Sequence, residues 1–311
     1  MMLAVETLGL SRRFARRWAV RDLDLAAPAG SVFGFLGANG AGKTTTLKMI
    51  LGLLKPSSGK AMVCGLDVIK QRSRAARQVG ALLEAQGFYP ELTAVQNLDL
   101  TRRLLNLPAS EIDRVLEIVA MGYAANRRVA GFSLGMRQRL GIARALIGSP
   151  GVLILDEPTN GLDPDGIIDM RQFLSALPSR ASATVLVSSH LLSEVEQTAT
   201  HLAIVEKGRL VLQGRIGDLL ATVPAEVALD TDAPERTSAI AAGLGFQPAE
   251  DGDGARLVYK QGIESRTACG ALTSALNEAG ITVFALAPKP PSLEAVYHRA
   301  IRHARHGEVV R

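Results

Sequence analysis

The chain has 311 residues, of which 47% are hydrophobic and 21% are charged, and this composition excludes a disordered or fibrous protein. The length exceeds that of a usual single domain of ~100 to 200 residues, so we expect a large domain and a smaller one. The net charge of +5 permits attraction to nucleic acid or anionic lipid but indicates no specific partner. We interpret the arginine clusters within 12–17 and 299–305 as solvated surface, with a membrane-facing patch as the alternative.

The apolar stretches are too short to cross a bilayer. The best of them, such as Val152–Leu155 and Thr184–Val187, fall far below the ~18 to 20 residues that a spanning helix needs. Met1–Leu10 has no basic region followed by an apolar core, so export is not expected. Cys64 and Cys269 stand far apart and form neither a metal-ligand nor a disulfide pattern. We therefore expect a chain that stays in a reducing cytoplasm.

The first strong structural pattern is a strand followed by a glycine-rich loop and a helix. The apolar run Ser31–Leu36 ends in the loop Gly37–Gly42, and a helical pattern continues over Leu47–Leu54 until Pro56 stops it. Short β elements precede this unit. From about residue 88 to residue 147 the apolar spacing is helical, which predicts an inserted helical subdomain.

The segments Val152–Leu155 and Thr184–Val187 are apolar throughout, as in strands that are buried on both faces of a sheet. Helical patterns separate them, so the first 215 residues predict an α/β domain. Past Gly214, recurrent prolines separate short strands from one clear helix at Ser265–Ala279. We therefore expect domains at 1–215 and 216–311, the second being a small α+β appendage.

The segment Gly37–Thr44 matches the phosphate-loop pattern G-x-x-x-x-G-K-[ST] between a strand and a helix. Its glycines let backbone N–H groups point at phosphate oxygens, and the helix start adds partial positive charge. Lys43 is expected to hold the β and γ phosphates of ATP, and Thr44 to ligate Mg²⁺. The predicted nucleotide contacts in this region are Gly37, Asn39, Gly40, Ala41, Gly42, Lys43, Thr44 and Thr45.

Two carboxylates follow the strand Val152–Leu155 directly. Asp156 is placed to support Mg²⁺, and Glu157 is the better candidate for polarising the attacking water. A pair of solvated acids at a strand end is the alternative. With the phosphate loop upstream, the pattern favours a nucleotide hydrolase.

Three further motifs narrow the family. Phe132–Met136, followed by a helical pattern, closely resembles the signature of ABC ATPases, usually LSGGQ, although Leu134 and Met136 depart from it. Pro158–Asp163 looks like their D-loop, and Ser188–His190 matches their switch-histidine position. Over about residues 3 to 215 the chain therefore resembles an ABC ATP-binding domain: a P-loop ATPase core with a β subdomain and an inserted helical subdomain.

This resemblance implies a head-to-tail homodimer that holds two ATP molecules between its subunits. Ser133 and Gly135 of one subunit would face the phosphate loop of the other. His190 would contact the γ-phosphate within its own subunit, and Asp163 would link the two sites. His190, Glu157 and Lys43 are the expected catalytic residues.

The resemblance also assigns roles at two less regular positions. Phe14 lies where the family carries an aromatic that stacks on adenine, with Trp18 as the competing candidate and a core aromatic as the third interpretation. Where the family usually has a glutamine that touches Mg²⁺ and senses the membrane partner, this chain has Glu84, and Gln86 is the alternative.

The chain also resembles the bacitracin and lantibiotic resistance branch of bacterial exporters, on the run FSLGMRQRLGIA and on Val79–Glu84, Gly87–Pro90, Leu92 and Thr93. This likeness implies export of a drug, antibiotic or peptide through a separately encoded membrane permease, with this chain peripheral at the cytoplasmic face and without a nucleic-acid partner. In such transporters the helical subdomain and the loop at Glu84 form the groove for a permease helix. Leu92, Val95 and Leu98 either contribute to that groove or pack internally.

A soluble ABC ATPase that acts on ribosomes or DNA is the competing function. Ribosome-associated members usually carry two cassettes in one chain, and chromosome-maintenance members carry long coiled coils, neither of which occurs here. A non-hydrolysing regulatory subunit is disfavoured because Lys43, Asp156, Glu157 and His190 are all present. Pro290–Tyr297 resembles the ending common in the exporter branch, which implies a regulatory or dimer-supporting appendage.

Overall fold

The computed structural model describes residues 2–83, 87–248, 256–259 and 265–306, which divide into two compact units. Unit 1 comprises Met1–Ile216 together with Ala300–Arg311, and unit 2 comprises Gly217–Arg299. The sequence-based boundary after residue 215 lies next to this division, whereas the end of the chain groups with unit 1 instead of the appendage. We propose unit 2 as the accessory domain.

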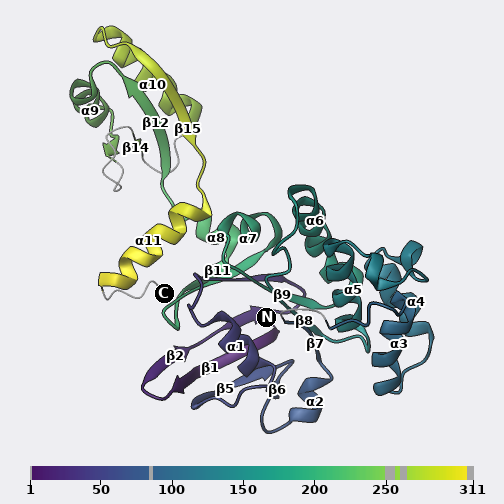
Figure 1. Cartoon of the computed structure of the whole chain (residues 1–311). Coiled ribbons are helices and arrows are strands. Elements are labelled where there is room, and N and C mark those ends of the chain that lie inside the picture. Colours follow the sequence, from purple (N-terminus) through teal and green to yellow (C-terminus); the bar gives the residue numbers. More distant parts are fainter. Residues whose placement is uncertain (1, 84–86, 249–255, 260–264, 307–311) are drawn as a thin grey trace. The chain divides into compact units, whose positions relative to one another are not determined.

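A six-stranded sheet forms the centre of unit 1 (Figure 1). Its order is β11-β10-β4-β9-β8-β7, and every neighbouring pair is parallel except β10 and β11. All residues of β4 and β9 are buried, as expected for strands covered on both faces. The strands are β4 (Val32–Leu36), β7 (Val79–Leu82), β8 (Val152–Asp156), β9 (Thr184–Ser189), β10 (His201–Glu206) and β11 (Arg209–Arg215).

Helix α1 (Lys43–Ile50) follows β4 through the glycine-rich loop, but it is shorter than the sequence pattern predicts. The prediction that the helix continues to Leu54 is wrong. Gly52 takes a left-handed φ of 66°, and the N–H groups of Leu53 and Leu54 turn back to the Lys48 carbonyl at 2.9 and 3.0 Å. A glycine in this conformation commonly ends a helix, because it turns the chain so that the following N–H groups reach the last free carbonyls.

A second, antiparallel sheet builds the β subdomain, with order β2-β1-β5-β6 and β3 paired to β1. Its inner face packs with α1 and with Phe33 and Phe35 of β4 in one apolar cluster. The elements are β1 (Leu3–Phe14), β2 (Arg17–Leu23), β3 (Ala26–Pro28), β5 (Ser58–Val63), β6 (Leu66–Asp67) and the short helix α2 (Arg72–Ala76).

The predicted helical subdomain forms beside β7, where Figure 1 shows its helices grouped together. They are α3 (Ala94–Leu104), α4 (Ser110–Ile118) and α5 (Leu134–Leu146), with 3₁₀ turns at Gly122–Ala124 and Val129–Gly131. Helix α3 begins at a capping box, in which Thr93 and Gln96 each accept the other's backbone N–H. Leu98 is fully buried in the subdomain's core, so its side chain packs internally and is not part of a surface groove.

Helices α6 (Pro164–Ala181) and α7 (Leu192–Thr198) cover the face of the central sheet opposite α1, which is the face on which α5 also packs. The contact of α7 with the sheet is close. A Cβ at Gly34 of β4 would lie 2.3 Å from a methyl carbon of Val195, so only glycine lets the helix approach this far.

Unit 2 has the element order β-α-β-β-α-β around an antiparallel sheet of order β13-β14-β12-β15. Its core includes Val227, Leu257 and Leu272 from the sheet and from α10. The observed α10 ends one residue before the predicted helix. The elements are α8 (Ile216–Leu220), β12 (Ala225–Thr231), α9 (Pro234–Gly243), β13 (Gln247–Pro248), β14 (Arg256–Tyr259), α10 (Ser265–Glu278), β15 (Val283–Lys289) and α11 (Leu293–His306), of which α8 and α11 lie at the ends.

The helical subdomain rests on β7 through a backbone contact that leads to a stability prediction. A Cβ at Gly80 would lie 1.9 Å from the backbone oxygen of Ala145 in α5. We expect Gly80→Ala to destabilise unit 1 by about 3 kcal/mol, because neither backbone can yield cheaply. Thermal unfolding measures this, with Gly122→Ala as the matched control, since a Cβ there meets nothing within 4 Å. Equal melting temperatures for the two variants would contradict the close packing.

Candidate functional site

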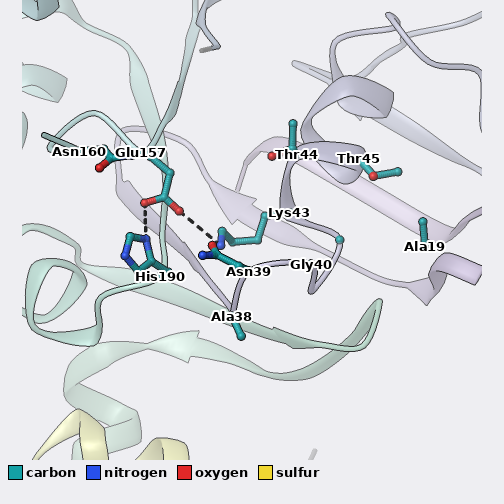
Figure 2. A pocket seen from close by; sticks show the side chains of 11 residues that line it. Ala19, Ala38, Asn39, Gly40, Lys43, Thr44, Thr45, Glu157, Asn160 and His190 are labelled. Atoms are coloured by element: carbon teal, nitrogen blue, oxygen red, sulfur yellow. Dashed lines mark hydrogen bonds and ion pairs between the residues drawn. The ribbon is translucent and has the colours of Figure 1, made fainter. Parts of the chain in front are cut away.

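A pocket of about 320 Å³ lies where β4, β8 and β9 end, and Figure 2 shows it from close by. Because parallel strands end at the same edge of the sheet, the segments that follow them meet there. β4 leads into the glycine-rich loop, β8 into Glu157 and β9 into His190. The residues that line the pocket are Ala19, Ala38, Asn39, Gly40, Gly42, Lys43, Thr44, Thr45, Glu157, Asn160 and His190.

The loop between β4 and α1 presents backbone donors to the pocket. Gly42 has a left-handed φ of 102°, and a Cβ on it would lie 2.5 Å from the Ala19 carbonyl oxygen, so glycine is required. No side chain caps α1, and the N–H groups of Lys43, Thr44 and Thr45 are the first of the helix, which have no intrahelical acceptor. Such a helix start binds anions.

Two of the predicted loop contacts use their N–H groups within the chain. Gly37 donates to the Ser189 carbonyl at 3.3 Å, and Ala41 donates to the Ala38 carbonyl at 3.0 Å. Neither residue lines the pocket. The Gly37 hydrogen bond fixes the loop to the end of β9, and the Ala41 hydrogen bond stabilises the turn within the loop.

Lys43 is buried between a carbonyl and a carboxylate. Its Nζ lies 2.6 Å from the Gly37 oxygen and 3.4 Å from Oε1 of Glu157, and the residue is only 6% exposed. A buried ammonium needs such partners, because desolvation is costly without them. The lysine is thereby held at the floor of the loop that would surround the phosphates.

Glu157 is held in a strained backbone conformation, with a φ of 49°. Its N–H donates to the carbonyl and the hydroxyl of Ser188, at 3.2 and 3.1 Å. Oε2 lies 2.6 Å from Nδ1 of His190, while Oε1 faces Lys43. Figure 2 shows the carboxylate between the imidazole and the ammonium, so both of its oxygens are oriented.

Asp156 and Thr44 form an oxygen-rich pair beside the loop. The Thr44 hydroxyl donates to Oδ2 of Asp156 at 3.1 Å, and the Ser188 hydroxyl donates to Oδ1. Mg²⁺ in nucleotide sites takes oxygen ligands, with few from the protein and the rest from water and phosphate, so this donor set fits the ion. Glu84, the third predicted ligand, and its alternative Gln86 lie outside the described residues.

The signature and D-loop residues lie elsewhere in the chain. The Ser133 hydroxyl accepts the Met136 N–H at 3.2 Å and caps α5, and Gly135 lies in the first turn of that helix. Asp163 caps α6 by accepting the Gly166 N–H at 2.9 Å. None of Ser133, Gly135 and Asp163 lines the pocket of its own chain.

The two candidate aromatics are on the surface. Phe14 is 46% exposed with the Arg12 guanidinium 4.7 Å from its ring centre, and Trp18 is 42% exposed. Neither is a core residue, and neither lines the pocket, although Ala19 beside Trp18 does.

Sequence reasoning did not assign a role to Ala19, Ala38 or Asn160, which all line the pocket. The Asn160 N–H donates to the Glu157 carbonyl at 3.1 Å, so the turn after Glu157 brings this side chain back. In the sequence, the position of Asn160 three residues after Glu157 was the available indication that it lies near the site. No comparable signal marks Ala19, whose chain segment belongs to the separate β subdomain.

Comparison with known proteins places this geometry in a family. The family model described as ABC transporter matches residues 20–160. The bacitracin transport ATP-binding protein BcrA of Bacillus licheniformis is 43% identical over 212 residues, which are 68% of this chain and 69% of that protein. The lantibiotic transport ATP-binding protein SrtF of Streptococcus pyogenes is 37% identical over 212 residues, 68% of this chain and 90% of that protein.

Among solved structures, CbiO1 from Clostridium perfringens, part of the ABC transporter complex CbiONQ, is similar with a TM-score of 0.66. At 24% identity, over 71% of this chain and 92% of that one, the likeness shows the fold alone and confirms the predicted fold class. Within the described ranges, no helix has the length and apolar character needed to span a membrane. The matched motifs and relatives confirm the resemblance, and the chain belongs to the ATP-binding subunits of ABC transporters, a family of ATPases.

Proposed function

We propose that the described pocket binds ATP with Mg²⁺ and hydrolyses it, and that this powers the export of a drug, antibiotic or peptide through a separate membrane permease. The observation that carries the proposal is the contact of Lys43, Glu157 and His190 beside the start of α1. The named activities of the relatives, bacitracin and lantibiotic transport, support the cargo class.

The contacts of Glu157 support its role as the base. His190 orients Oε2, while Lys43 lies 3.4 Å from Oε1. Phosphate oxygens of ATP compete with that carboxylate for the ammonium, so binding leaves Oε1 available to polarise the attacking water. Thr44 and Asp156 would hold Mg²⁺, which would supply neutralising charge at the phosphates.

A second copy of the chain completes the proposed site. Ser133 and Gly135 do not reach the pocket of their own chain, and the first turn of α5 carries no acidic residue. The start of this helix therefore favours an anion that another subunit presents. ATP would join two such half-sites into a homodimer.

An apolar pocket of about 350 Å³ is the proposed permease contact. It includes Leu53, which is 64% exposed, and Leu83, the residue directly before Glu84 in the sequence. An exposed apolar side chain at such a pocket fits an apolar segment of a partner. Through this contact the chain would sit at the cytoplasmic face of the membrane without crossing it.

The catalytic assignment predicts distinct defects for two variants. Glu157→Gln is expected to bind ATP and to lose at least about 100-fold in turnover, because the amide is no base, and to accumulate as an ATP-bound dimer. Lys43→Ala is expected to lose ATP affinity. Phosphate release, nucleotide titration and size-exclusion chromatography measure these effects, with the exposed Glu117→Gln as the matched control. Near wild-type turnover of Glu157→Gln would remove this residue from the role of base.

The transport assignment predicts a membrane partner. We expect tagged Glu157→Gln chain with ATP, purified from gently solubilised host membranes, to retain a polytopic membrane protein in stoichiometric amount by mass spectrometry. Leu53→Asp should lose that protein while keeping ATPase activity, whereas Leu104→Asp should keep both, since Leu104 is 86% exposed and lies outside the pocket. Ribosomal or DNA-associated partners without a membrane protein would instead support the soluble ATPase.

A further inference from the structure

Glu194 is a buried carboxylate to which the catalytic proposal gives no part. It lies in the first turn of α7 and is only 6% exposed. Removing a carboxylate from water is costly unless hydrogen bonds or nearby positive charge compensate. The partners of this side chain therefore indicate what it holds in place.

The carboxylate is hydrogen-bonded to the residue before His190, which in turn is hydrogen-bonded to the residue after it. The Ser189 hydroxyl donates to Oε2 of Glu194 at 2.7 Å, and the same oxygen of Ser189 accepts the N–H of Leu191 at 2.9 Å. Ser189 is itself 1% exposed. One carboxylate thus fixes, through a single hydroxyl, the turn that carries His190.

The same turn is anchored to the central sheet. The Ser189 carbonyl accepts the N–H of Gly37, the first residue of the phosphate loop, at 3.3 Å. Val195, the residue after Glu194, packs directly on Gly34 of β4. Glu194 therefore lies in a helix that is packed closely on the central sheet. Its hydrogen bond to Ser189 ties the turn to that helix.

The orientation of the His190 imidazole depends on this turn. Its side chain is 37% exposed, so surrounding atoms restrain it only partly, yet its Nδ1 lies 2.6 Å from Oε2 of Glu157. Because few side-chain contacts restrain the His190 ring, its orientation depends mainly on the backbone conformation of residue 190. In a catalytic site a displacement of about 1 Å can cost 100-fold in rate.

We propose that Glu194 is a positioning residue for the hydrolysis reaction, which acts through Ser189 and the turn at Leu191 to aim His190 at Glu157. This inference rests on the proposed role of His190 in ATP hydrolysis. Glu194 does not line the pocket and touches no reacting atom.

Two variants of similar volume separate the hydrogen bond from packing. Glu194→Met fills the space without an acceptor for Ser189, whereas Glu194→Gln keeps an amide oxygen. We expect Glu194→Met to lower kcat by roughly 10- to 100-fold with little change in the KM for ATP, and Glu194→Gln to recover most of the loss. ATPase kinetics and melting temperatures are measured on the full chain.

A double-mutant cycle with His190→Ala tests whether Glu194 acts through the histidine. The proposal predicts that Glu194→Met causes no further loss of kcat in the His190→Ala background. The control is Thr198→Val on the same helix, since the buried Thr198 hydroxyl donates to the backbone carbonyl of Glu194 at 2.6 Å and not to its carboxylate. This control should keep wild-type kcat even where its melting temperature falls.

Three results would overturn the inference, and they are distinguishable. Additive losses in the cycle would show that Glu194 acts independently of His190. An equal loss of kcat in Thr198→Val at matched melting temperature would reduce Glu194 to a stabiliser of α7. Wild-type kcat in His190→Ala alone would remove the histidine from the proposed mechanism, and the positioning role would fall with it.

Discussion

The arrangement of the site depends on one interaction, the carboxylate of Glu157 between the ammonium of Lys43 and the imidazole of His190. Lys43 lies more than a hundred positions before the other two in the sequence, and Glu157 and His190 are 33 positions apart. The three meet because β4, β8 and β9 are adjacent and parallel. The burial of these strands keeps their ends in register, and the tight approach of loop backbones requires glycine at Gly42. The rigid sheet thus converts distant sequence motifs into a defined geometry.

The same geometry leaves the site incomplete within one chain. The pocket offers a helix start, a lysine and a carboxylate, while the signature helix begins outside it with no acidic residue in its first turn. Two helix starts that carry no acid in their first turns repel each other until an anion lies between them. In the proposed dimer, ATP supplies that anion, so nucleotide binding and subunit association become one event.

The sequence predicted the strand-loop-helix unit, the helical subdomain and the convergence of motifs, because each rests on local periodicity or on a defined spacing. It did not predict contacts that depend on tertiary packing. The end of α1 before Leu54 was decided by Gly52, and the burial of Leu98 by the neighbouring helices. Likewise, Leu134 in place of the usual signature glycine packs against Gly161, where a Cβ would lie 3.2 Å from its methyl carbon. Such a contact between the start of α5 and the segment before α6 is visible only in the folded chain.

The most direct test of the proposed two-subunit site is an engineered disulfide. In a Glu157→Gln chain with Cys64 and Cys269 replaced by serine, Ala38→Cys in the loop and Leu134→Cys in the signature are combined and oxidised with and without ATP. The account predicts a covalent dimer on a non-reducing gel that forms only with ATP and requires both new cysteines. Failure to form an intermolecular bond although ATP is bound would contradict it.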